Sequence, residues 1–180
     1  PFFILKNPKK SMGFEPLETF DIKTIIPPAN DLPCDAEVVD NTGGDVDIVI
    51  MGNNDCATQE FEDPICADED ISSVYYLYTV PMGVNGLAIT LADVGMGTNF
   101  LLGAYDFMGD CMGTPTTLID SDCNADGNEM LLECLEEGDE IYFIVSTESE
   151  NAGDFTLTIN PTVPDPTCID NDLCADADGT

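Results

Sequence analysis

The residues best suited to chemistry in this sequence are oxygen-bearing side chains spaced like the ligands of a calcium loop. Asp122, Asn124 and Asp126 alternate, Gly127 follows at once, and Glu133 stands at the twelfth position of the run. In such a loop, side-chain oxygens at the first, third and fifth positions and a distal glutamate surround the ion, and the glycine permits a sharp turn. The segment predicts Ca²⁺ bound by Asp122, Asn124, Asp126 and Glu133. The alternative is an acidic hairpin loop without metal.

The eight cysteines are a second group with chemistry of their own. Their number is even, no C-x-x-C pair occurs and the chain has no histidine, so disulfides are favoured over zinc and all the cysteines within the sandwich unit are expected to be oxidised. Cys111 and Cys123 bracket a segment of hairpin length and are assigned as a pair, and Cys34 and Cys66 as another. Eight cysteines allow about 105 pairings, so the other connectivity stays open. Disulfides predict an extracellular or cell-surface location.

Catalysis finds little support in the residue types. Without histidine, Ser-His and Cys-His nucleophile systems are excluded. Carboxylates are so abundant that no acid–base pair stands out among them. The chain also lacks the tryptophan that would form a platform for sugars. The sequence therefore predicts that the protein is not an enzyme.

Charge divides the chain into two unequal parts. The four cationic side chains are Lys6, Lys9, Lys10 and Lys23, whereas all but three of the 36 acidic residues follow Lys23, and the net charge is −32. A body without cations forms no internal salt bridge and must bind cations, meet a basic partner or tolerate self-repulsion. It cannot neutralise phosphates, so nucleic acid is excluded as a partner. No apolar run approaches the length of a transmembrane segment.

Short β-like runs alternate with turn residues from residue 34 onward, and no helical period is sustained. This spacing predicts an all-β sandwich of eight or nine antiparallel strands, each with one buried face. The nine predicted runs are Ala36–Asp40, Val46–Met51, Val74–Val80, Leu87–Ala92, Phe100–Tyr105, Thr116–Ile119, Met130–Leu135, Ile141–Thr147 and Phe155–Asn160.

The first part of the chain, residues 1–29, is rich in proline and predicts an extended N-terminal arm with a single strand. The strand places Phe20, Ile22 and Ile26 on one face. The arm holds every lysine of the chain, so attraction between the arm of one copy and the body of another is expected.

Two internal echoes indicate a repeat. Asn30–Ala36 recurs as Asn171–Ala177, and the strand of the arm resembles Phe155–Ile159 in the same order. Residues 30–163 are therefore expected to form one sandwich domain. Residues 164–180 are then a linker or the start of a next repeat.

Five segments also carry a family resemblance. Pro28–Cys34 resembles a "PANDxC" start and Ser73–Thr79 a "DVWYSFT" strand. Leu101–Tyr105, continued through Cys111 to Asp122–Asn124, resembles "LAVYSGxC…LxACND". Glu137–Val145 resembles an "AGTTYYIRV" strand and Asp154–Ile159 a closing "GxFTLTI" strand. In this order the segments resemble the bacterial pre-peptidase C-terminal domain family, whose members are secreted, jelly-roll-like β-sandwiches found in tandem. The resemblance implies a jelly-roll-like fold and a non-catalytic accessory or adhesive role, and it supplies no catalytic residues.

The function expected from the sequence is that of a non-catalytic, extracellular structural subunit or repeat module of a surface filament or assembly. Its partners would be copies of itself or adjacent repeats, joined through the arm with Lys6, Lys9 and Lys10 and the strand of Phe20, Ile22 and Ile26. Two alternatives stay open: an adhesin module that binds a glycan or protein, and an accessory domain of a secreted hydrolase.

Overall fold

The described part of the chain is built almost entirely from β-strands. The computed structural model describes residues 26–42, 46–58, 71–93, 100–106, 117–122, 129–148 and 151–162. The elements are a short 3-10 helix η1 (Pro33–Asp35) and the strands β1 (Glu37–Val38), β2 (Ile48–Asn53), β3 (Ile71–Thr79), β4 (Gly86–Asp93), β5 (Leu101–Asp106), β6 (Thr117–Asp122), β7 (Glu129–Glu133), β8 (Glu140–Glu148) and β9 (Asp154–Thr162). Each strand overlaps one predicted run, so the all-β prediction is confirmed.

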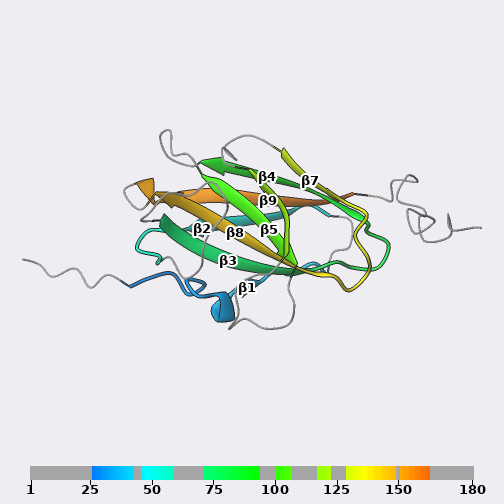
Figure 1. Ribbon diagram of the computed structural model, residues 1–180, viewed down its shortest axis with the longest axis horizontal. Coiled ribbons are helices and arrows are strands. Elements are labelled where there is room, and N and C mark those ends of the chain that lie inside the picture. Colours follow the sequence, from blue (N-terminus) through cyan, green and yellow to red (C-terminus); the bar gives the residue numbers. More distant parts are fainter. Residues whose placement is uncertain are drawn as a thin grey trace, which may run out of the picture.

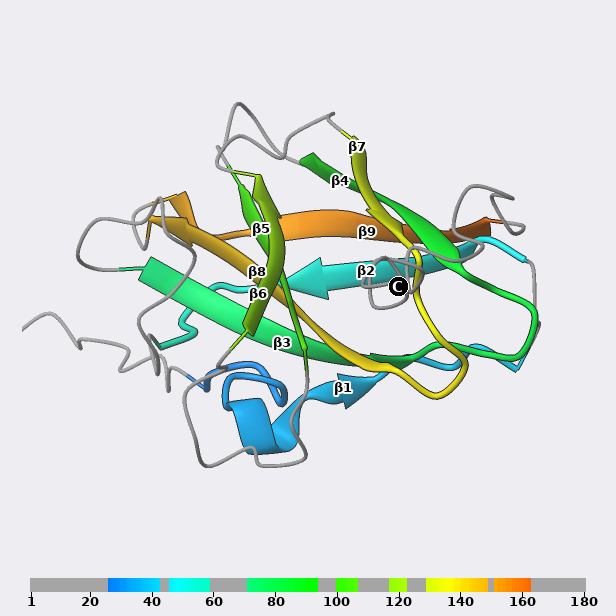
Figure 2. The same ribbon diagram turned by 45° about the vertical axis from the view of Figure 1, so that its right-hand side comes forward.

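The strands form two facing sheets (Figure 1). One sheet has the order β1-β3-β8-β5-β6 and the other the order β2-β9-β4-β7. Most consecutive strands from β2 to β9 lie in opposite sheets, which gives the two four-stranded halves of a jelly roll. In Figure 2, β2 and β9 run side by side, and their six-residue ladder is antiparallel and without register shifts.

Strand β1 departs from the prediction that all pairs are antiparallel. It pairs with β3 in parallel, with Glu37 opposite Tyr76, and it lies at the edge of that sheet (Figure 2). Its direction is fixed on both sides. The backbone N–H of Tyr75 donates to the carbonyl of Asn30 at 3.0 Å, and the N–H of Val39 donates to the carbonyl of Leu77 at 2.9 Å. The segment from Asn30 to Val39 therefore runs beside β3 and in the same direction as β3.

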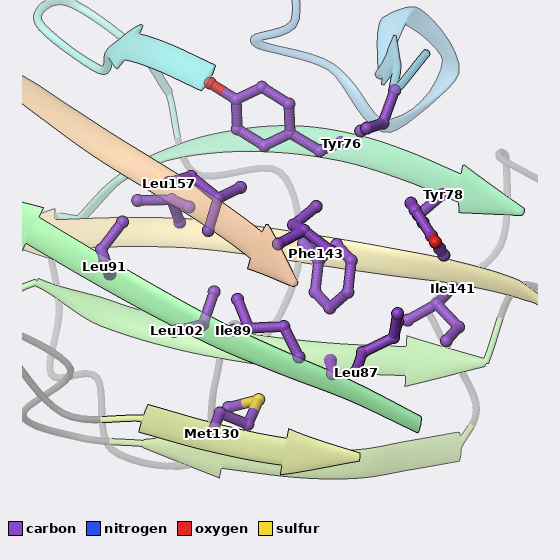
Figure 3. Close-up of a cluster of buried hydrophobic side chains, with 14 of the residues drawn as sticks. Tyr76, Tyr78, Leu87, Ile89, Leu91, Leu102, Met130, Ile141, Phe143 and Leu157 are labelled. Carbon is purple, nitrogen blue, oxygen red and sulfur yellow. The ribbon is translucent and has the colours of Figure 1, made fainter. Parts of the chain in front are cut away.

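The main core lies between the two sheets and is drawn in Figure 3. Alternate residues of β3, such as Tyr76 and Tyr78, point into it and meet the inward side chains of β4 and β9. The ring of Phe155 packs against Phe100 with centroids 5.3 Å apart and against Tyr76 at 6.3 Å, both edge-on. Such aromatic pairs add about 0.5–1.5 kcal/mol to the area they bury.

A second apolar cluster covers the other face of the five-stranded sheet. It contains Tyr75, Tyr105, Tyr142 and Ile144, so β3, β8 and β5 are buried on both faces. The prediction of one buried face per strand is therefore wrong for these three inner strands. Part of the cover is the segment Asn30–Ala36, which we call the cover segment. Its residue Pro33 accepts a 2.8 Å hydrogen bond from the hydroxyl of Tyr142, and its residue Ala36 packs against the cluster.

The outer face of the four-stranded sheet is different. Along β2 the exposure alternates, and the outward side chains of Val49 and Met51 are 61% and 82% exposed. Leu131 of β7 is also exposed, and Thr156 and Thr158 of β9 are half-buried between these strands. This face presents apolar and small polar side chains to solvent.

Candidate functional site

The predicted calcium loop connects the two sheets. Asp122 ends β6 in one sheet and Glu133 ends β7 in the other, whereas Asn124 and Asp126 lie outside the described residues. Because β7 is extended, Glu133 lies about 13 Å along the strand from Glu129, the first described residue after Asp122. No group of three or more candidate ligands gathers within the described ranges. The calcium site stays a prediction.

The cysteine framework is partly visible. Cys34 in η1 and Cys134 after β7 are both disulfide-bonded. Cys66, Cys111 and Cys123 lie outside the described residues. The pairings Cys111–Cys123 and Cys34–Cys66 therefore stay predictions.

Cys56 corrects the expectation that every cysteine is oxidised. It is a thiol whose Sγ donates to Oδ1 of Asp55 over 3.5 Å. The residue lies in the turn after β2 with a left-handed backbone, φ 67°. That turn is held by its own polar contacts, since the N–H of Asp55 donates to Oδ1 of Asn53 at 2.7 Å.

Of the residues predicted to mediate assembly, Ile26 is the one that the structure describes, and it is 77% exposed. Pro27 and Pro28 follow it, the first of them exposed and the second half-buried. Lys6, Lys9, Lys10, Phe20 and Ile22 lie outside the described residues.

The Asn30–Asp31 pair of the family-like start has a structural role that sequence reasoning did not assign. The side-chain amide of Asn30 donates to the carbonyl of Tyr75 at 3.2 Å. The carboxylate of Asp31 accepts from the backbone N–H and the hydroxyl of Thr58, at 2.5 and 3.1 Å. Both residues are buried. Together they close the edge of β3 and attach it to the segment that follows β2.

Asn54 joins the two sheets at the same end. Its side-chain amide donates to the carbonyl of Ser72 at 2.9 Å, and its Oδ1 accepts from the N–H of Gly153 at 2.9 Å. The side chain is fully buried, where losing such partners costs about 1–3 kcal/mol for each unsatisfied group. Both polar atoms of the Asn54 side chain are thus bonded to protein groups, so the residue holds the two sheets together.

The strand tyrosines do not offer acid–base chemistry near neutral pH. Burial raises the pKa of Tyr76 to about 12, an effect that the Asn30 side chain partly offsets and the Glu37 carboxylate reinforces. Burial also raises the pKa of Tyr78 and of Tyr142. All three hydroxyls stay protonated and behave as core groups.

Four strands lie at the edges of the two sheets, and three of these edge strands are protected against pairing with another chain. β1 is two residues long, β6 carries Asp120 and faces a register shift in β5, and β7 begins and ends with exposed glutamates. Short length, charge and irregular pairing are the usual means of blocking an edge.

The fourth edge, β2, lacks these protections. Its six residues, Ile-Val-Ile-Met-Gly-Asn, include no proline and no charged side chain, and its ladder with β9 is regular. Val49 and Met51 are exposed on one face, while Ile48 and Ile50 are half-buried against the core on the other. A regular, uncharged edge strand with exposed apolar side chains is a template for pairing with another chain. Within the described residues no strand pairs with the outer side of β2, so we take this edge as the candidate functional site.

Electrostatics around this edge is uniform in sign. The last lysine of the sequence is Lys23, so the described residues contain carboxylates and no cationic side chain. Asp47 precedes β2, and Asp154, opposite Asn53, starts its neighbour β9; both are exposed. A partner that binds here would be favoured by positive charge.

Comparisons with known proteins give little beyond the fold. No protein-family model and no curated protein matches the chain. Among solved structures, a similar one is the crystal structure of PliG from Aeromonas hydrophila, a periplasmic lysozyme inhibitor of g-type lysozyme. The match covers 71% of this chain and 96% of that protein, with a TM-score of 0.46 and 9% identity. A likeness this distant carries no functional argument. Within the described ranges, no helix is long and apolar enough to cross a membrane.

Proposed function

We propose that this chain is a non-catalytic structural module of an extracellular assembly, which joins copies of itself or adjacent repeats by addition of a strand to a sheet edge. The observation that carries the proposal is β2, a regular and unprotected edge strand with apolar side chains on both faces. Such an edge is a template for pairing with another chain.

The chemistry of the side chains supports a non-catalytic role. The sequence has no histidine, and burial raises the pKa of Tyr76 and Tyr142. The buried polar side chains of Asn30, Asp31 and Asn54 are all hydrogen-bonded within the protein. Within the described part of the chain, these groups are engaged in the hydrogen bonds and the core of the fold, which supports a structural role for them.

The oxidised state of Cys34 and Cys134 supports a location outside the cytoplasm, because disulfides persist in oxidising compartments. The resemblance to secreted tandem domains and the second Asn-Asp-Leu start at Asn171 support assembly of several modules in a row.

The arm is the natural partner of the edge, because it holds the lysines that the body lacks. Deleting residues 1–26 should abolish assembly, measured by light scattering and electron microscopy, with the thermal midpoint kept. A matched control replaces Lys6, Lys9 and Lys10 by Gln, which removes charge and keeps the strand. That variant should assemble more weakly at low salt and like wild type at high salt. A shortened protein that assembles like the intact one contradicts the proposal.

Calcium is proposed as a stabilising ion, with Asp122, Asn124, Asp126 and Glu133 as its ligands. The support is the ligand spacing and a strongly acidic body that gains from counter-charge. Thermal unfolding with Ca²⁺ and with a chelator should give a lower midpoint in the chelator, and Asp126→Asn should remove most of that difference. An equal midpoint at low ionic strength would refute a structural calcium site.

A further inference from the structure

We propose that β2 is the acceptor edge, and that the segment Phe20–Ile26 of a second copy pairs with it as a fifth strand of the four-stranded sheet. This inference rests on the proposed function and specifies the surface that it uses. Four steps support it: the direction of the free backbone groups, the fit of the side chains, the charge and the path of the arm.

The backbone groups of β2 that point to the open side can be assigned. The N–H of Asn54 donates to the carbonyl of Gly153 at 3.2 Å, which continues the register of β2 with β9. Along an antiparallel strand the direction of these bonds alternates from one residue to the next. Ile48 and Ile50 therefore bond to β9, while Val49 and Met51 direct their N–H and C=O groups to the open side. Among the described residues no strand pairs with that side, so these groups can serve a partner strand as donors and acceptors.

The side chains next to this edge fit an apolar strand. Ile48 and Ile50 point inward but are half-buried, and within the described residues no strand lies beyond β2 to cover them. The arm places Phe20, Ile22 and Ile26 on one face. Strand addition would set that face beside the two isoleucines and extend the core by one strand.

The charges are complementary. The edge is flanked by Asp47 and Asp154, and the described body carries no cation. The arm's strand contains Lys23, and the arm as a whole holds the other three lysines. Attraction between the arm of one copy and the body of the next therefore favours this pairing over pairing between two bodies, whose like charges repel.

The path of the chain favours a second copy as the donor over the same chain. Ile26, the last residue of the predicted strand, is 77% exposed, so its side chain does not pack on its own sandwich. Pro27 and Pro28 follow, and consecutive prolines keep the backbone extended and restrict a turn back toward β2. From there the chain is fixed by Asp31 to Thr58.

The test blocks the edge in the full-length chain. Val49→Pro with Met51→Pro removes two N–H donors on the open side and keeps those that serve β9. The matched control is Leu131→Pro on β7. The alternation of hydrogen-bond direction can be followed from β9 to β4 and from β4 to β7, because both ladders are regular. It places the Leu131 N–H on the side of β7 that faces away from β4. The β2 variant should assemble about tenfold more weakly or worse, since two hydrogen bonds are lost, and the control should assemble like wild type.

If the proline variant unfolds, Val49→Lys with Met51→Lys replaces it, because both side chains are exposed and lysine on an edge discourages pairing. Mixing then identifies the donor. The β2-blocked full chain supplies a free arm, and the chain lacking residues 1–26 supplies a free edge. Neither should assemble alone, and their mixture should form discrete heterodimers.

The outcomes separate the two proposals. If deletion of the arm abolishes assembly but the β2 variants assemble normally, β2 is not the acceptor and the proposed function stands. Loss of assembly in Leu131→Pro alone assigns the acceptor to β7 and also overturns the inference. A mixture without heterodimers shows that each arm covers its own β2. If the arm deletion itself assembles like wild type, the proposed function fails as well.

Discussion

On the five-stranded sheet, Tyr142 and Ile144 point away from the inter-sheet core and are nevertheless buried, whereas Val49 and Met51 hold outward positions on the four-stranded sheet and are exposed. The outer side chains differ in kind, since Tyr75, Tyr105 and Tyr142 lie on the first sheet and Thr156 and Thr158 on the second. The cover segment Asn30–Ala36 adds to the difference, because its Pro33 and Ala36 contact the outer cluster of the five-stranded sheet. One outer face is thus part of the interior, and the other is exposed to solvent at Val49 and Met51.

The largest effect should come from truncating the covered face. Ile144→Ala removes a side chain that is 1% exposed, and we expect it to reduce the free energy of unfolding by about 2–5 kcal/mol, as in any core. Val49→Ala, on the open face, should cost less than about 0.5 kcal/mol. Urea unfolding of the two variants measures both values. Equal losses of free energy in the two variants would contradict the difference in burial between the two outer faces.

Alkaline pH should reduce the free energy of unfolding by an amount similar to that expected for Ile144→Ala. Burial raises the pKa of Tyr76 from its ordinary value of 10 to about 12, so the folded state holds its proton more tightly. This stabilisation is complete below pH 10 and is lost as the pH rises to 12, by about 3 kcal/mol for a shift of that size. Tyr142 adds to the loss, because burial under the cover segment and the Glu140 carboxylate also raise its pKa.

The measurement is the urea midpoint between pH 8 and pH 12. Tyr76→Phe should flatten the decline above pH 10, since the variant has no proton to release there. A decline of the same steepness in both proteins would assign the alkaline loss to other groups.

The inner side of β2 should behave as core even though its outer side is open. A Cβ placed at Gly52 would meet the ring of Phe155 and the hydroxyl of Tyr76, which Figure 3 shows pointing toward β2. Gly52→Ala should therefore destabilise the protein by about 1–3 kcal/mol through overpacking. Gly153→Ala is the matched control, because a Cβ there meets no atom within 4 Å. Thermal melting compares the two, and a similar midpoint in both would show that β2 is loosely attached.

The smallest effect should come from loosening the cover segment. Tyr142→Phe removes the 2.8 Å hydrogen bond to the carbonyl of Pro33 and should cost about 1 kcal/mol. Hydrogen exchange of the amides in Asn30–Ala36 should become faster, while exchange in β2 stays as it was. Unchanged exchange in the cover segment would mean that other contacts hold it in place.

Local patterns in the sequence predicted much of the fold. All nine strands were predicted, because alternation and turn residues are properties of short stretches. The jelly-roll arrangement was implied by the family resemblance. The candidate functional site was harder to predict from the sequence. The arm was predicted to add to an open edge. Four strands lie at the edges of the two sheets, however, and no local sequence pattern indicates which strands lie there.

What the sequence determined by itself is a disulfide-bonded, strongly acidic β chain, because charge, cysteines and strand periods can be read residue by residue. The tertiary structure decided three further points: that β1 pairs in parallel, that β3, β8 and β5 are buried on both faces, and that β2 lies at the edge of its sheet within the described residues. Each of these depends on contacts between residues far apart in the chain, such as Pro33 with Tyr142. Such contacts fix which surfaces are covered, and a strand's own residues do not record what lies beside it.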